Sequence, residues 1–287
     1  MKLAAAAAAR LGGLYPADDP RIAWLPDAPD AAEAHLRLDG SCDLVIGYAG
    51  HRFPELDVFV ERCAGHAAEL GHADHRPAWE RWIAATGTAI ADAGAQLGAA
   101  RGRLQVYLRG YYDPAAVSCA FAAVGCEASP RLVGNALALF AVHTVEMMGL
   151  ELADDRIGAA VYLAVPNAGG AAAAAALDEA IGFVIAAIQP AGRAAREAWR
   201  AVAADLLATV SEEHVYVSFD PTPALGWVKV DVGARPLALA DRLGRRLGLP
   251  VGPMIEAATA RGLTSPSHVS LRFAGGSPAL SIYHPLA

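Results

Sequence analysis

The stretch HVYVSFDPTPALGWVKVDVG, residues 214–233, decides how the rest of the chain is interpreted. Two runs alternate bulky apolar residues with polar ones, and an Asp-Pro dipeptide stands between them. Alternation with a period of two is typical of a strand with one buried face, and Asp and Pro favour the turn that joins two such strands. The stretch therefore predicts an antiparallel hairpin whose first strand turns Val215, Val217 and Phe219 to one face.

The same unit recurs along the chain. Two extended runs around a turn are predicted in residues 42–63, 145–165 and 268–284, and residues 103–110 form one strand whose partner is poorly defined. Between these units lie stretches predicted to be helical: residues 77–98, 129–144, 171–188, 191–209, 236–248 and 253–261. Helices placed between hairpins, and not between single strands, favour antiparallel pairing over a Rossmann sheet.

About five such units predict an α+β fold. Five hairpins with helices on one side can close into a ten-stranded antiparallel β-barrel ringed by helices, built from repeated αββα units, and closure removes the sheet edges. We expect residues 1–287 to form this single domain, with residues 1–34 as a helical or irregular N-terminal segment.

The polar faces of the strands have two interpretations. Either they face solvent, as in many antiparallel sheets, or they line the lumen of the barrel. These faces are rich in aromatic and cationic residues, which bind apolar cations and phosphates and favour the lumen. The residues concerned are Arg103, Gln105, Tyr107, Arg109, Tyr162, His214, Tyr216, Ser218, Trp227, Lys229, Asp231, His268, Ser270, Arg272, Ser281 and Tyr283.

Composition narrows the possible functions. The chain of 287 residues has 55% hydrophobic and 18% charged residues, which suits a large core. Its net charge of −7 argues against a nucleic-acid partner. No strongly apolar run reaches transmembrane length, and the four cysteines contain no CxxC pair, so we expect a cytoplasmic protein with no membrane partner. A bridge between Cys42 and Cys63 across the first hairpin is disfavoured.

A group of histidines precedes the helical stretch at 77–98. His66, His72 and His75 lie with Asp74 in GHAAELGHADHRP. Metal ligands are normally fixed on rigid elements, whereas this segment is a polar connector before Pro77. We therefore expect no metal site here.

Several segments resemble one family, the ABBA-type aromatic prenyltransferases. The first hairpin, GSCDLVIGY…PELDVFVER, is similar to the first hairpin of that family, and QVYLRG, AAVYLAV and WVKVDV are similar to its Lys-x-Tyr strands. HVSLRFAGGSPALSIYHP is similar to its last hairpin, which ends in Tyr. The likeness covers most of residues 35–287 and is greatest to dimethylallyltryptophan synthases and to the smaller cyanobactin-type peptide prenyltransferases.

The resemblance implies an activity and a set of roles. The family transfers a prenyl group from a prenyl diphosphate, such as dimethylallyl or geranyl diphosphate, to an aromatic or peptide side chain such as an indole or phenol, often in secondary metabolism or peptide modification. No cofactor is required by the family as a whole, and Mg²⁺ is used only in some subfamilies. The implied roles are catalytic base for Asp43, acceptor binding for Trp227, diphosphate binding for Arg109, Lys229 and Arg272, and a tyrosine shield made of Tyr107, Tyr162, Tyr216 and Tyr283.

The chain departs from the family pattern at several positions. Gln105 and Ala160 stand where the pattern has a cation, Asp57 where it has an Arg, and Asp231 where Tyr is usual. A cyanobactin-style alignment puts Val45 at the acid position in place of Asp43. Only two lysines occur, Lys2 and Lys229, so a diphosphate site depends heavily on Lys229.

These departures leave two alternatives to a prenyltransferase. The first is a barrel that binds a small molecule or peptide and has lost diphosphate chemistry. The second is a lumen enzyme of another reaction type that uses Asp43 with His214 or His268 as acid and base. Lys229 itself is either a lumen residue or an exposed strand lysine.

Overall fold

The computed structural model describes most of the chain. The described residues are 31–48, 56–87, 90–98, 104–153, 156–166, 170–188, 192–207, 214–233, 237–275 and 278–286. The predicted N-terminal helix and the turn around Gly50 and Pro54 lie outside them. Among the described residues no helix is both long and apolar enough to cross a membrane.

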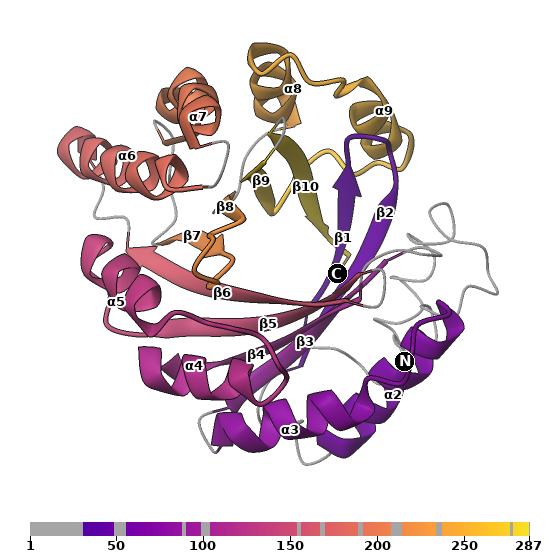
Figure 1. Ribbon diagram of the computed structural model, residues 1–287. Helices are drawn as coiled ribbons and strands as arrows, with labels where there is room; N and C mark the ends of the chain where they lie inside the picture. Colours follow the sequence, from indigo (N-terminus) through magenta and orange to yellow (C-terminus); the bar gives the residue numbers. More distant parts are fainter. Residues whose placement is uncertain are drawn as a thin grey trace.

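Ten strands form a closed antiparallel barrel, which confirms the predicted fold (Figure 1). Strands adjacent in sequence are adjacent in the barrel, and β1 pairs with β10 to close it. The strands are β1 (Ala31–Arg37), β2 (Cys42–Tyr48), β3 (Ile90–Leu97), β4 (Leu104–Tyr112), β5 (Val145–Ala153), β6 (Arg156–Pro166), β7 (His214–Phe219), β8 (Trp227–Gly233), β9 (His268–Ala274) and β10 (Ala279–Pro285).

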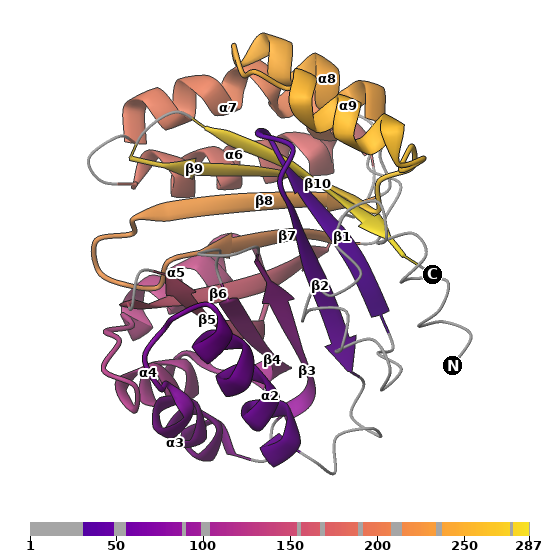
Figure 2. The same ribbon diagram turned by 90° about the vertical axis from the view of Figure 1, so that its right-hand side faces the viewer.

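Helices lie around the outside of the barrel, and none of those described crosses its lumen (Figures 1 and 2). They are α2 (Leu56–Glu69), α3 (Arg76–Thr86), α4 (Pro114–Ala122), α5 (Pro130–Leu139), α6 (Gly170–Ala186), α7 (Gly192–Leu207), α8 (Leu237–Arg246) and α9 (Gly252–Ala260). Local signals fix some of their ends. Asp113 and Ser129 accept hydrogen bonds from the first-turn N–H groups of Ala116 and Leu132, which caps α4 and α5.

The core lies between the outer face of the barrel and the helices. The alternate residues of β4 that the sequence assigned to the apolar face, Leu104, Val106 and Leu108, are at most 2% exposed. Trp199 of α7 packs edge to face on Phe273 of β9, with ring centroids 6.1 Å apart. Burial of one such large side chain contributes about 1.5–3 kcal/mol, so this layer holds the helices on the barrel and leaves the other strand face to the lumen.

Part of the predicted first hairpin is wrong. Residues 56–69 form helix α2 and not a second strand, because Phe59, Val60, Cys63 and Ala67 recur with the helical spacing of three and four and are all buried. Cys63 therefore lies on a helix, and both it and Cys42 are free thiols. The partner of β2 is β1, which begins at residue 31 inside the segment expected to be helical or irregular.

The helix predicted at 77–98 is also partly wrong. Helix α3 ends at Thr86, followed by Gly87 with φ of +72°, a backbone conformation that favours glycine at a helix end. The rest of the stretch is β3, the missing partner of β4. Its sequence IADAGAQL alternates alanine with polar residues, and the helix propensity of alanine hid that alternation. Helix α4 was not predicted, and α5 ends at Leu139, short of residue 144.

Candidate functional site

A cavity of about 450 Å³ lies inside the barrel. All ten strands contribute lining residues, so it belongs to the lumen and not to the surface. The lining includes the four tyrosines predicted for the shield, Tyr107, Tyr162, Tyr216 and Tyr283, together with Lys229 and Arg109. The lumen interpretation of these polar faces is therefore confirmed, and Lys229 is not an exposed strand lysine.

The tyrosines bring both rings and hydroxyl groups to the cavity. The rings of Tyr107 and Tyr162 meet edge to face with centroids 5.7 Å apart. Burial raises the pKa of Tyr107, Tyr162 and Tyr283, so their hydroxyl groups stay protonated at neutral pH. Neutral rings around an enclosed space can stabilise an apolar cation through their π faces.

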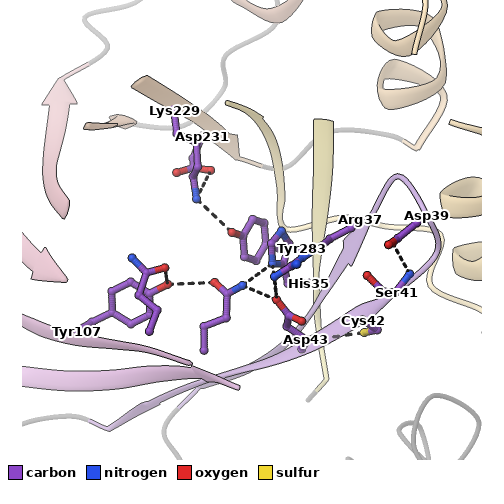
Figure 3. A network of polar contacts seen from close by, with 12 residues as sticks. His35, Arg37, Asp39, Ser41, Cys42, Asp43, Tyr107, Lys229, Asp231 and Tyr283 are labelled. Carbon is purple, nitrogen blue, oxygen red and sulfur yellow. Dashed lines mark hydrogen bonds and ion pairs between the residues drawn. The ribbon is translucent and has the colours of Figure 1, made fainter. Parts of the chain in front are cut away.

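Lys229 is held between β8 and β10. Its Nζ donates a hydrogen bond of 3.1 Å to the hydroxyl of Tyr283 and lies 3.1 Å from Oδ1 of Asp231 (Figure 3). Burial opposes the charge of this ammonium, but the Asp231 carboxylate and the hydroxyl groups of Tyr283 and Tyr162 together outweigh it, and the pKa of Lys229 is raised. Lys229 is therefore a permanently charged cation that faces the cavity.

Arg109 of β4 is the second cation of the lining and is half exposed. Its Nε donates a hydrogen bond of 2.9 Å to Oε1 of Glu146, and its Nη1 lies 3.7 Å from Oδ2 of Asp92. Both carboxylates come from the strands that flank β4, namely β5 and β3. Among the described residues, the cavity is thus lined by one enclosed lysine or arginine, Lys229, and by one that is half exposed, Arg109.

Uncharged residues surround the hydroxyl groups of the lining residues Tyr107 and Tyr162. Gln105 donates a hydrogen bond of 2.8 Å to the hydroxyl of Tyr162, and the hydroxyl of Tyr107 lies within hydrogen-bond distance of the amide oxygens of Gln96 and Gln105. Ala160 points to the same lumen and is fully buried opposite Gly149. Two positions at which the resemblance implies cations are therefore uncharged here.

Asp43 faces the lumen on the same side of β2 as the lining residue Val45, two positions away, but is not itself part of the lining. It is 2% exposed, accepts a hydrogen bond of 2.7 Å from Gln96, forms an ion pair with Arg37, and lies 3.6 Å from Nδ1 of His35 (Figure 3). Burial opposes the charge of its carboxylate, but these partners outweigh it and lower the pKa. The ring of His35 in turn stacks on Tyr283 with centroids 4.2 Å apart.

Glu33 lines the cavity and was missed by the sequence analysis. It lies on β1, where Ser267 donates a hydrogen bond of 2.6 Å to Oε1 and Nδ1 of His268 lies 3.8 Å away. Burial opposes ionisation, but these contacts outweigh it and lower the pKa of Glu33. The alternation Glu33, His35, Arg37 between buried Ala32, Ala34 and Leu36 was the available signal, masked by the alanines.

Arg272 and Trp227 face the lumen but do not line the cavity. The guanidinium of Arg272 lies over the ring of Trp227 at 4.4 Å from its centroid, and its Nη2 lies 3.8 Å from Oε2 of Glu151. Of the two histidines considered as alternatives, His268 lines the cavity, whereas the side chain of His214 lies outside the described part of the chain. Arg272 is nevertheless the register partner of Lys229 on the neighbouring strand β9, so the two cations are adjacent although only Lys229 and Arg109 line the cavity.

No protein-family model matches the chain, and no curated protein matches it in sequence. Solved structures match its fold. A 6-dimethylallyltryptophan synthase from Micromonospora olivasterospora in complex with DMASPP and Trp has a TM-score of 0.62 at 16% identity, covering 99% of this chain and 95% of that one. NotF in complex with brevianamide F and DMSPP has a TM-score of 0.61 at 10% identity, covering 90% and 80%.

A third solved structure agrees. AnaPT from Neosartorya fischeri has a TM-score of 0.55 at 12% identity, covering 88% of this chain and 77% of that one. At these identities the likeness concerns the fold, which extends over nearly the whole chain. Together with the closed ring of ten antiparallel strands, it shows that this chain has the ABBA barrel fold of the aromatic prenyltransferases.

Proposed function

We propose that the protein transfers a prenyl group from a prenyl diphosphate to an aromatic acceptor, an indole or phenol of a small molecule or of a peptide side chain. The observation that carries this proposal is the enclosed ammonium of Lys229, set among four tyrosines in the described lining of the lumen cavity. Support also comes from the solved structures of the same fold, which hold DMASPP with Trp and DMSPP with brevianamide F.

The donor binds with its diphosphate at Lys229 and, nearer to solvent, at Arg109. Charge-assisted hydrogen bonds to phosphate are about twice as strong as neutral ones, and they strengthen as charge builds up on the leaving group. Heterolysis of the allylic C–O bond leaves both electrons on the diphosphate and a prenyl cation beside the tyrosine rings. The rings of Tyr107, Tyr162, Tyr216 and Tyr283 stabilise that cation and exclude water from it.

The acceptor attacks the prenyl cation with an aromatic π pair, which forms the new bond, and then loses a proton. The base must lie where the acceptor binds, which disfavours Asp43 because that carboxylate is buried and paired with Arg37. Glu33 is the better candidate, since its carboxylate lines the cavity. A low pKa does not prevent this role, because the protonated aromatic intermediate is a strong acid.

One assay tests the proposal. The protein is incubated with dimethylallyl or geranyl diphosphate and a panel of indoles, phenols and peptides that contain Trp or Tyr, and products are followed by mass spectrometry. We expect the gain of one prenyl mass and release of diphosphate. Absence of any prenylated product, together with absence of diphosphate binding in calorimetry, would refute the transferase.

Replacement of Glu33 tests the assignment of the base. Glu33→Gln keeps the size of the side chain and its contact with Ser267 but cannot take a proton. We expect kcat to fall on the order of 10²-fold while donor affinity stays unchanged. A Glu33→Gln protein with full kcat would exclude Glu33 as the base.

The second candidate function is a barrel that binds a small molecule or peptide without diphosphate chemistry. It is favoured by one observation, the uncharged Gln105 and Ala160 at two positions of the lumen wall. This alternative predicts binding of an aromatic ligand without binding of diphosphate. Calorimetry with inorganic diphosphate alone therefore separates the two functions before any acceptor is known.

A further inference from the structure

The ammonium of Lys229 is already engaged in the empty cavity. It donates to the hydroxyl of Tyr283 and lies 3.1 Å from the carboxylate of Asp231. An ammonium has three N–H donors, so the contacts among the described residues leave one of them for a ligand. A phosphate group that accepts hydrogen bonds from two N–H groups of Lys229 must therefore displace either the hydroxyl of Tyr283 or the carboxylate of Asp231.

Asp231 is fixed in place and faces the same space as Lys229. It lines the cavity, and Ser270, its register partner on β9, donates a hydrogen bond to Oδ1. Lys229 and Asp231 are two residues apart on β8 and so share the lumen face. A phosphate bound at Lys229 is consequently a near neighbour of a carboxylate, and like charges at such separations repel.

The remaining lining does not offset this repulsion. The described residues around the cavity include three carboxylates, Glu33, Asp92 and Asp231, against the two permanent cations Lys229 and Arg109. Arg109 already contacts Asp92 and Glu146. The described lining therefore carries no surplus positive charge to receive a diphosphate, and the negative charge of Asp231 acts on the ligand directly.

Two roles for Asp231 are consistent with its position, and they predict opposite effects. If Asp231 only anchors Lys229, its loss leaves the ammonium misplaced and weakens binding of an anion. If Asp231 competes with the anion for Lys229, loss of its charge strengthens that binding. The hydrogen bond that Lys229 donates to the hydroxyl of Tyr283 favours the second role, because it holds the ammonium between β8 and β10 without Asp231.

We propose that Asp231 is a counter-ion that competes with diphosphate for Lys229. It weakens the hold of the cavity on the donor and on the diphosphate that remains after transfer, and so favours release of that product. This inference rests on the proposed function, since it assigns a role to a residue of the same site. When the diphosphate leaves, the Lys229–Asp231 pair forms again.

Calorimetry with inorganic diphosphate tests the inference without any acceptor. Asp231→Asn keeps the size of the side chain and an oxygen that can accept from Lys229 and Ser270, but removes the charge. We expect Kd for diphosphate to fall about tenfold at constant ionic strength, and inhibition of transfer by added diphosphate to become correspondingly stronger. Asp231→Glu, which keeps the charge, should bind no more tightly than the wild type.

Asp241→Asn is the matched control for a change of net charge. Asp241 lies on α8, where it pairs with the exposed Arg245 four residues away, far from the lumen face of the barrel. The control should leave Kd for diphosphate unchanged. A similar tightening in both variants would mean that net charge alone is responsible, and the inference would be wrong.

The possible outcomes separate the inference from the proposed function. If the wild type prenylates an acceptor but Asp231→Asn binds diphosphate equally or less tightly, Asp231 is an anchor and only the inference fails. If Asp231→Asn binds diphosphate more tightly but no acceptor is ever prenylated, the counter-ion role stands and the transferase falls. If no variant binds diphosphate, both fail.

Discussion

Two ion pairs lie inside the same barrel and differ in what they face. The cavity pair, Lys229–Asp231, lines the space where a ligand can bind. The network pair, Arg37–Asp43, lies on the same lumen face but outside the cavity lining, where Asp43 is also held by Gln96 and His35. Two pairs of a basic and an acidic side chain therefore have different roles. A charged group that faces a cavity can exchange its partner for a ligand, whereas a charged group enclosed by its partners stabilises the barrel.

The two ion pairs are connected through the side chains of His35 and Tyr283. His35 contacts Asp43 on one side and stacks on Tyr283 on the other, and Tyr283 accepts the hydrogen bond from Lys229. The network pair thus supports the aromatic ring that holds the cation of the cavity pair. Changes in the network pair should appear mainly in stability, and changes in the cavity pair mainly in binding.

Replacement of Asp43 should have the largest effect on stability. Asp43→Ala leaves Arg37 without its ion pair and removes an acceptor from Gln96. We expect the free energy of unfolding to fall by about 3 kcal/mol, at the low end for breaking a buried pair because Arg37 is partly exposed. Urea unfolding followed by circular dichroism measures this change. A stable Asp43→Ala protein that has lost only its activity would restore Asp43 as a candidate base.

Replacement of Lys229 should act on the ligand instead. Lys229→Ala removes the enclosed cation, and loss of one charged contact to phosphate costs roughly 1.5–3 kcal/mol. Affinity for a prenyl diphosphate should therefore fall by about ten- to a hundred-fold in calorimetry. Asp231 then loses its cation but keeps the hydrogen bond from Ser270, so the fold should persist. Unchanged donor affinity would place the diphosphate elsewhere in the lumen.

The fold could be predicted because its decisive strands alternate strongly. The hairpins at 145–165, 214–233 and 268–284 carry bulky apolar residues on one face and turn residues between the strands, and all three are present. The alanine-rich strands β1 and β3 could not be recognised, because alanine packs on either kind of surface and favours helix locally. Tertiary pairing in the barrel overrides that preference.

The site residues that could be predicted also lie on the strands with clear alternation, and those that could not lie on the alanine-rich strands. The lumen residues Lys229, Tyr107, Tyr162, Tyr216 and Tyr283 come from strands with clear alternation and could be predicted, whereas Glu33 and Asp92 lie on the alanine-rich strands and could not. The sequence also does not show how far along the barrel axis each lumen residue lies. Alternation shows which face a residue shares but not its level, so Asp43, Arg272 and Trp227 were grouped with a cavity that they do not line.

A smaller effect links the network pair to pH. Burial lowers the pKa of His35 below its ordinary value of 6.5, although the nearby Asp43 carboxylate opposes the shift. A histidine whose pKa is lowered by folding contributes stability above its unfolded pKa, and that stability is lost as the pH falls below about 6.5. The lowered pKa of Asp43 adds a second loss, which begins only as the pH falls through its ordinary value of 3.8.

His35→Gln separates the first loss from the second, because glutamine does not titrate and can still bond to Gln96. Between pH 7.5 and 5.5 the wild type should lose more stability in urea unfolding than His35→Gln does, by less than the cost of Asp43→Ala. Equal slopes for the two proteins would mean that His35 takes up no proton on unfolding in this range. The imidazole of His35, which stacks on Tyr283, would then already be charged in the folded barrel. The carboxylate of Asp43 would in that case neutralise this charge in addition to stabilising the barrel.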